Sequence, residues 1–207
     1  VALIAVPWLL RDHLATELDA QSSAAAEVQT ALHQESERAL QVARWLEEQL
    51  GVAPVPGGAH LLMGTHNRLL RLGGGERLYL ELIAIDPAAP LPGRPRWFGL
   101  DDPALQARLA ERPRLIHWVA RSDDLARDAT PAHGEILDMQ RGDFRWRIAV
   151  PADGSLPAGG RAPTLIQWDV PCHPAERLPE SGCTLLEFDT TGPAAVLQTP
   201  RGRVRLD

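Results

Sequence analysis

The alternation of apolar and polar residues divides the chain into a helical first part and a β-rich remainder. Residues 11–50 contain no glycine or proline, and apolar side chains recur there in steps of three and four residues. This pattern is typical of an amphipathic helix or a pair of helices. Gly51 follows as the expected C-terminal cap. The sequence therefore predicts an unusually long N-terminal helix that ends at residue 50.

Beyond Gly51, short apolar runs with a two-residue alternation predict β-strands. Residues 65–72 and 77–85 flank three consecutive glycines, as expected for a β-hairpin. Asp102, followed by Pro103, predicts the start of a short helix that ends near residue 112. In the second half of the chain we expect strands over residues 114–120, 135–140, 144–150 and 163–169, with a helical turn over residues 123–129.

The two halves share one order of elements, βαβββ. In the first half this order requires a strand over residues 1–6 before the long helix and a weak strand near residues 52–55 after it. The organising hypothesis is therefore a repeated βαβββ unit. We expect four regions: an N-terminal strand and helix (1–50), the rest of module one with a connector (51–112), module two (113–170) and a C-terminal β tail of two or three strands (171–207).

The composition excludes several classes of function. All 21 basic residues are arginine, so the chain has no lysine for a Schiff base, for a phosphate-binding loop or for a general base. A net charge of -6 disfavours binding to nucleic acid or to an anionic membrane. The apolar run over residues 1–10 is about half as long as a membrane span. We expect a cytoplasmic protein whose partner is a small molecule, with no nucleic-acid or membrane partner.

Glu81 and His117 lie on otherwise apolar faces of predicted strands, and Gln167 shares the face of its predicted strand with Leu165 and Asp169. A buried acid is costly unless it is paired or bound to a metal. Carboxylate, imidazole and amide groups of this kind suit a divalent metal that keeps open positions for a substrate. Two alternatives stay open: Glu81 pairs with one of the many arginines, or His117 is a hydrogen-bonded core residue.

His66 and Asn67 belong to the densest polar cluster of the sequence. They either organise a turn or line a pocket, where they would donate hydrogen bonds to an oxygen of the substrate. Trp118, Trp146 and Trp168 all fall on strands of the second half. They either pack in the core or line a cup for a small organic ligand.

Four segments together resemble the glyoxalase-like domain of the vicinal-oxygen-chelate (glyoxalase/bleomycin resistance/dioxygenase) superfamily. The resemblance covers roughly residues 39–183 and implies an α+β fold, in which paired βαβββ modules form a cupped mixed sheet around a central cavity. The segments are Pro56-Gly57-Gly58-x-His60, Gly64-Thr65-His66-Asn67, Tyr79-Leu80-Glu81-Leu82-Ile83 and Pro163-Thr164-Leu165-Ile166-Gln167-Trp168.

The resemblance implies a divalent metal, such as Zn, Ni, Mn or Fe, and no nucleotide cofactor. Glu81, His117 and Gln167 match metal-ligand positions on the first and last strands of the modules. The remaining position, on the opening strand, normally carries an Asp-His pair, but residues 1–6 offer no ligand. Asp12-His13 has these residue types within the predicted helix.

Two functions of different classes follow from these features. One is metal-assisted lyase, isomerase or dioxygenase chemistry on a small oxygenated metabolite, with Glu81 and His66 as catalytic residues and His66, Asn67 and the three tryptophans in contact with the substrate. The other is a metal-free module that binds or sequesters a small molecule without catalysis. A third interpretation makes residues 11–50 an oligomerisation helix or a juxtamembrane stalk, with the rest of the chain as a sensory domain. A homodimer is a further expectation.

Overall fold

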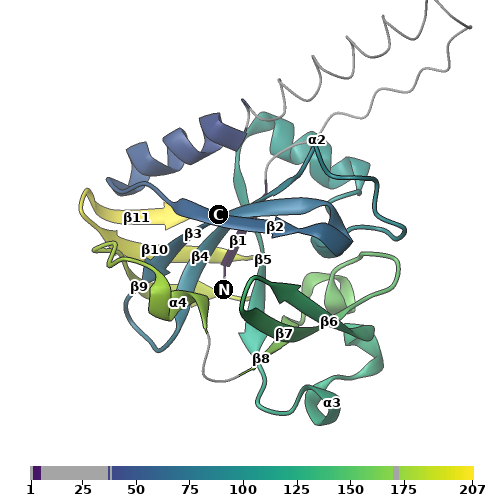
Figure 1. Cartoon of the computed structure of the whole chain (residues 1–207). Helices are drawn as coiled ribbons and strands as arrows, with labels where there is room; N and C mark the ends of the chain where they lie inside the picture. Colours follow the sequence, from purple (N-terminus) through teal and green to yellow (C-terminus); the bar gives the residue numbers. More distant parts are fainter. Residues whose placement is uncertain (1, 6–36, 38, 170–172) are drawn as a thin grey trace, which may run out of the picture.

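The computed structural model describes residues 2–5, 37, 39–169 and 173–207. Its main feature is an eight-stranded sheet with the order β2-β3-β4-β1-β5-β8-β7-β6 (Figure 1). The strands of the first module are β1 (Ala2–Ala5), β2 (Val55–His60), β3 (Thr65–Leu72) and β4 (Leu78–Ile85). The strands of the second module are β5 (Arg114–Arg121), β6 (Glu135–Arg141), β7 (Phe144–Val150) and β8 (Thr164–Trp168).

The strand order reads the same from the centre of the sheet outwards in both directions. Each module contributes its first strand at the centre, then its fourth, third and second strands. The first strand pairs in parallel with the fourth in each module, and the two first strands, β1 and β5, pair antiparallel with each other. The expected pair of βαβββ modules in a cupped mixed sheet is thus confirmed.

Strand β2 lies later in the sequence than expected. The sequence predicted a weak strand near residues 52–55, whereas β2 spans Val55–His60. The difference arises because β2 is an edge strand, where a proline or glycine costs little pairing. Pro56 lacks an amide hydrogen, and the register with β3 shifts between Pro56 and Gly58. The Pro56-Gly57-Gly58 sequence, which would disfavour a strand in the centre of a sheet, is therefore compatible with an edge strand.

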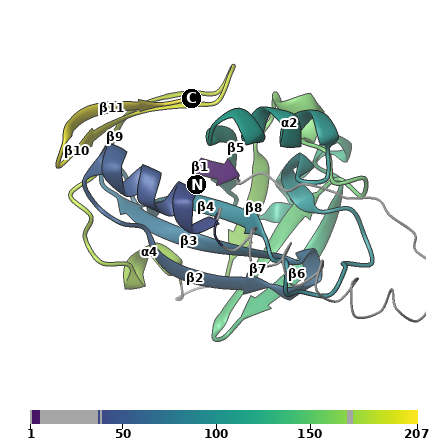
Figure 2. The same cartoon turned by 90° about the horizontal axis from the view of Figure 1, so that it is seen from above.

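A helix over residues 39–50 and a separate three-stranded sheet cover one side of the first module (Figure 2). The small sheet consists of β9 (Thr184–Asp189), β10 (Ala194–Thr199) and β11 (Gly202–Leu206). Leu46 and Leu50 of the helix are fully buried in one core with Leu80 of β4 and Leu197 of β10. Most of the predicted helix before residue 37 lies outside the described residues, as does Asp12-His13.

A second core fills the space between the modules. Leu105 and Leu109 of helix α2 (Pro103–Glu111) pack there with Ile83 and Ile148. Asp102 caps α2 as predicted, because its side chain accepts a hydrogen bond from the amide of Ala104. The remaining short elements are α3 (Leu125–Asp128), α4 (Pro174–Arg177) and 3-10 turns at Leu61–Met63, Trp97–Gly99, Pro131–His133 and Pro157–Gly160. Within the described residues, no helix has the length and apolar character needed to cross a membrane.

Candidate functional site

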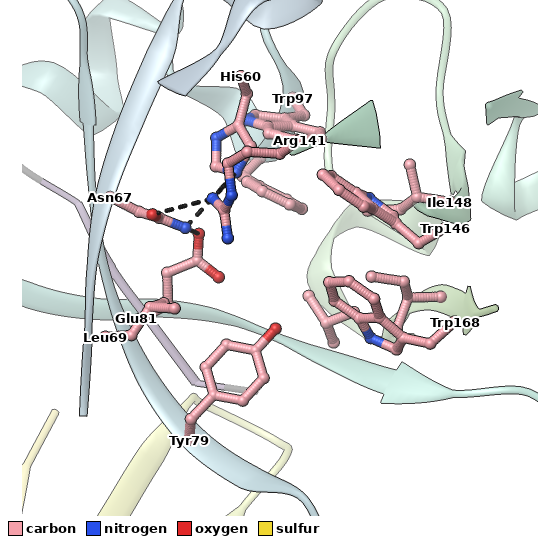
Figure 3. A pocket seen from close by; sticks show the side chains of 13 residues that line it. His60, Asn67, Leu69, Tyr79, Glu81, Trp97, Arg141, Trp146, Ile148 and Trp168 are labelled. Carbon is pink, nitrogen blue, oxygen red and sulfur yellow. Dashed lines mark hydrogen bonds between the residues drawn. The ribbon is translucent and has the colours of Figure 1, made fainter. Parts of the chain in front are cut away.

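A pocket lined by 13 residues lies between the two modules. Both modules and the connector between them contribute to its wall (Figure 3). The polar lining residues are His60, Asn67, Tyr79, Glu81 and Arg141, and the apolar ones are Leu69, Trp97, Phe98, Val119, Trp146, Ile148, Ile166 and Trp168. The polar side chains, with the exception of Arg141, come from the first module, so the pocket has one polar and one apolar side.

Glu81 and Asn67 form the centre of the polar side. Asn67 donates a hydrogen bond from Nδ2 to Oε1 of Glu81 over 2.6 Å, and both residues are buried. Oδ1 of Asn67 accepts hydrogen bonds from the backbone amide of Gly58 and from Nη1 of Arg141. Because donors meet its oxygen and an acceptor meets its nitrogen, these contacts fix the orientation of the amide.

Arg141 joins the two modules across the pocket. It lies at the end of β6, and its Nη1 donates to Nε2 of His60 on β2 over 3.1 Å. Since arginine can only donate, Nε2 of His60 must be the unprotonated ring nitrogen. His60 therefore donates from Nδ1 to Oγ1 of Thr65, 3.1 Å away. Burial, together with the charge of Arg141, lowers the pKa of His60 to about 3, which agrees with a neutral ring.

Two glycines of β2 make room for this network. A Cβ on Gly57 would lie 2.0 Å from Oδ1 of Asn67, and a Cβ on Gly58 would lie 2.7 Å from Cδ of Arg141. Neither distance is sterically tolerable, so the backbone of β2 can approach both side chains only at glycine. The Pro56-Gly57-Gly58 segment thus has a physical role in shaping the pocket.

The apolar side consists mainly of aromatic rings. The ring centroids of Trp146 and Trp168 lie 5.0 Å apart. The rings of His60 and Trp97 form an edge-to-face pair whose centroids are also 5.0 Å apart. The guanidinium of Arg141 lies over the Trp146 ring, with its central carbon 5.9 Å from the centroid. Flat apolar surfaces of this kind favour a ligand with a ring or an aliphatic tail.

Two titratable side chains of the pocket, Glu81 and Tyr79, have pKa values that burial shifts towards the neutral form. Burial raises the pKa of Glu81, although the hydrogen bond from Asn67 and the charge of Arg141 oppose this shift. Burial and the nearby Glu81 also raise the pKa of Tyr79 well above its usual value. Figure 3 shows the Tyr79 hydroxyl directed into the pocket beside Glu81. A buried carboxyl group with a raised pKa can exchange a proton with a bound molecule.

Four of the residues predicted from the sequence line this pocket: Asn67, Glu81, Trp146 and Trp168. His66 and Trp118 do not line it, because neighbouring residues of a strand point to opposite faces. His66 alternates with the pocket residue Asn67 on β3, and burial lowers its pKa. The ring of Trp118 meets Phe188 of the small sheet at a centroid distance of 6.1 Å.

The structure does not bring Gln167 to the pocket. It pairs with Arg147 on β7, whereas the pocket residues Trp146 and Trp168 pair with each other. Its Oε1 accepts hydrogen bonds from Arg147 and from the amide of Leu125. Gln167 therefore lies on the opposite face of the sheet, where its oxygen joins β7, β8 and α3.

His117 lies on the same face of the sheet as Glu81, but Leu3 separates them. Leu3 of β1 pairs with Glu81 on one side and His117 on the other, and its side chain is fully buried. Nε2 of His117 accepts a hydrogen bond from the amide of Thr164. Burial lowers the pKa of His117 to about 4.

The described residues do not fit a metal site with three protein ligands. They contain no group of three or more His, Cys, Asp or Glu side chains placed to hold a metal ion. Of the predicted ligands, only Glu81 reaches the pocket, and the apolar side chain of Leu3 occupies the position between it and His117. The predicted set of Glu81, His117 and Gln167 stays a prediction.

The sequence alone did not reveal His60, Tyr79, Trp97 and Arg141 as pocket residues. Tyr79 could have been found, because it lies two residues before Glu81 and so shares its face of β4. His60 follows the two glycines whose contacts are described above. Arg141 carries no comparable signal, since its contact with β2 depends on how the edges of the sheet approach each other.

Three solved structures resemble this fold. A methylmalonyl-CoA epimerase from Mycobacterium tuberculosis is 17% identical, with 81% of this chain and 83% of that chain covered and a TM-score of 0.37. The corresponding Streptomyces coelicolor enzyme, solved in complex with 2-nitronate-propionyl-CoA, is 15% identical, with 81% and 90% covered and a TM-score of 0.37. A hypothetical protein from Staphylococcus aureus is 13% identical, with 75% and 76% covered and a TM-score of 0.38.

The family comparison is more informative. A search of curated proteins finds no match. The family model described as "Glyoxalase-like domain" matches residues 37–201, which is most of the chain and includes every residue of the pocket. The chain therefore belongs to the glyoxalase-like domain family of the vicinal-oxygen-chelate superfamily.

Proposed function

We propose that this protein binds a small oxygenated organic molecule in the pocket between its two modules, and that binding requires no resident metal. The observation that supports the proposal best is the two-sided lining of the pocket. Hydrogen-bonding groups from Asn67, Tyr79 and Glu81 face the rings of Trp146 and Trp168. Such a lining orients a ligand by its oxygen atoms and holds its carbon skeleton on the aromatic surface.

The positions of the tryptophans allow a direct test. Small carbonyl, hydroxy and carboxylic compounds that carry one ring or a short aliphatic chain are titrated in the presence of EDTA while tryptophan emission is recorded. Binding in the pocket should change the emission of Trp146 and Trp168. The Trp146→Phe and Trp168→Phe variants should lose most of the ligand-dependent change.

Trp118→Phe provides the matched control. This tryptophan lies on a strand of the same sheet but outside the pocket lining, against Phe188. Its replacement should leave the ligand response intact. If no compound changes the emission, or if Trp118→Phe abolishes the response and Trp146→Phe does not, the pocket is not the binding site and the proposal is wrong.

One observation favours a second candidate function, which is catalysis by proton transfer. Only Oε1 of Glu81 accepts a hydrogen bond from the described residues, so Oε2 is available to a bound molecule. A buried carboxyl with an available oxygen can take a proton from a carbon or oxygen of the ligand, or return one to it. In this function Glu81 is the acid–base residue.

In this second candidate function, catalysis could use a divalent metal or proceed without one. Metal analysis after incubation with Zn, Ni, Mn or Fe, on the wild type and on Glu81→Gln, separates the alternatives. Stoichiometric metal that is lost in Glu81→Gln would overturn the metal-free proposal. Hydrogen exchange into a bound carbonyl compound, measured by NMR with EDTA present, would support catalysis by Glu81 without metal.

A further inference from the structure

We infer that the pocket is selective for a small monocarboxylate, whose carboxylate group binds the free side of the Arg141 guanidinium while its apolar part lies on Trp146 and Trp168. This inference builds on the proposed function and narrows it to one chemical class. It comes from the geometry around Arg141, which the sequence pattern did not single out.

The hydrogen bonds of Arg141 leave half of its guanidinium available. Both of its hydrogen bonds, to His60 and to Asn67, start from Nη1. Nη2 makes no hydrogen bond to any residue that the structure describes. Figure 3 shows the guanidinium between the Asn67–Glu81 pair and the ring of Trp146. A ligand in the pocket would therefore meet the free donors of Nη2.

Arg141 forms no ion pair with a described carboxylate, in contrast to several other arginines of this protein. Arg77, Arg96 and Arg177 each form an ion pair with a neighbouring carboxylate. In the described part of the chain no carboxylate lies within ion-pair distance of Arg141, although its charge acts on Glu81 in the same pocket and lowers the pKa of that carboxyl against the larger, opposite effect of burial. A half-buried guanidinium that forms no direct ion pair favours an anionic ligand, and its planar donors match a carboxylate.

The ring of Trp97 lines the same pocket. Its indole nitrogen has no hydrogen-bond partner among the described residues, but the atom is buried and has no surface open to the cavity. The donors that a ligand can reach are those on Nη2 of Arg141, and they call for acceptor oxygens on the ligand. The two oxygens of one carboxylate are the simplest group that supplies acceptors and a negative charge together.

The lining of the pocket limits the rest of the ligand. The contact surface that Trp146 and Trp168 provide is flat and apolar. A carboxylate that carries one ring or a short branched chain matches this surface.

The experiment compares acids with their uncharged amides. Phenylacetate and phenylacetamide, and mandelate and mandelamide, are titrated against wild-type protein in EDTA at pH 7.5, with tryptophan emission as the readout. We expect each acid to bind at least tenfold more tightly than its amide. An amide that binds as tightly as its acid would overturn the inference, while the proposed function would stand. If neither acids, amides nor neutral carbonyl compounds bind, the proposed function itself fails.

Variants of Arg141 complete the test. Arg141→Gln should remove the preference for the acid, and Arg141→Lys, which keeps the charge without the planar donors, should retain part of it. Arg145→Gln is the matched control, because Arg145 is exposed and lies outside the pocket lining. If Arg141→Gln unfolds at the same temperature as the wild type and still prefers the acid over its amide, another group binds the acid. A comparison of the acid and amide in the wild type remains decisive even if Arg141→Gln unfolds.

Discussion

Asn67 donates a hydrogen bond to Glu81 from the neighbouring strand, and its oxygen simultaneously accepts from Gly58 and Arg141. One amide thus connects the buried carboxyl of the first module to the arginine of the second. Both modules depend on it for the shape of the polar side of the pocket.

We expect Asn67→Asp to destabilise the protein more than Asn67→Ala. The aspartate would place a second carboxylate 2.6 Å from Glu81, in place of the amide donor. The alanine only leaves buried partners unsatisfied, which costs about 1–3 kcal/mol. Urea unfolding at pH 7 provides the measurement, with the exposed Gln140→Ala as control. Equal stabilities of Asn67→Asp and wild type would contradict the described contact.

Gly57→Ala should lower the free energy of unfolding by about 1–3 kcal/mol, as overpacking usually does. The new Cβ would lie 2.0 Å from Oδ1 of Asn67, so either β2 or the amide must move. Gly93→Ala is the control, since a Cβ there has no heavy atom within 4 Å. We expect the control to stay within about 0.5 kcal/mol of wild type. A Gly57→Ala protein as stable as the control would show that β2 lies farther from Asn67.

Glu81→Gln should raise the unfolding temperature at pH 8. Glutamine keeps an oxygen for the hydrogen bond from Asn67 and removes a buried carboxylate that no described cation pairs with. A gain of about 1 kcal/mol would correspond to about 2–4 °C for a chain of this size. Calorimetry of wild type and variant without added metal is the measurement. A lower unfolding temperature would mean that the charged form of Glu81 is stabilised in the native protein.

Stability should fall as the pH decreases from about 6.5 towards 4. Burial, as the largest cause, lowers the pKa of His60 to about 3 and that of His173 to about 4. The unfolded chain binds these protons near pH 6.5 while the native protein does not, so each histidine costs about 1.4 kcal/mol per pH unit in that window. Glu81 acts in the opposite direction, because its raised pKa favours the native state as the pH falls.

His173→Asn isolates one of these contributions. Nδ1 of His173 accepts a hydrogen bond from the amide of Ala175 at the start of α4, which an asparagine can also do without titrating. The free energy of unfolding, measured in urea, should depend less steeply on pH in this variant. The decrease in slope should correspond to about one proton fewer taken up on unfolding. An unchanged slope between pH 6.5 and 4.5 would show that His173 titrates normally in the native protein.

The sequence predicted those parts of the fold that have a strong local pattern. Strands β3 and β7 have the predicted bounds, because glycine-containing turns flank both, and in β7 apolar and basic residues also alternate. The start of α2 is also as predicted, because Asp102 and Pro103 favour a helix start wherever the helix packs. These features require no knowledge of distant contacts.

The pocket was predictable only in part, because most of its contacts join residues that are far apart in the sequence. Alternation placed Glu81 on an apolar face, but it could not show that the face belongs to a cavity. The contact between Arg141 and His60 joins the two edge strands, β6 and β2, and depends on the curvature of the whole sheet. The fully buried Leu3 between Glu81 and His117 depends on the register of β1 with two strands far along the sequence.

The central position of β1 has a consequence for synthesis on the ribosome. Ala2 pairs with Leu80 on one side and with Trp118 on the other, so β1 is made long before either partner. The two modules cannot pair through β1 and β5 until β5 (Arg114–Arg121) has left the exit tunnel. Until then a nascent chain can pair β1 with β4 but leaves its other edge open. The interval between residues 85 and 121 is therefore the stage at which we expect the growing chain to depend most on chaperones.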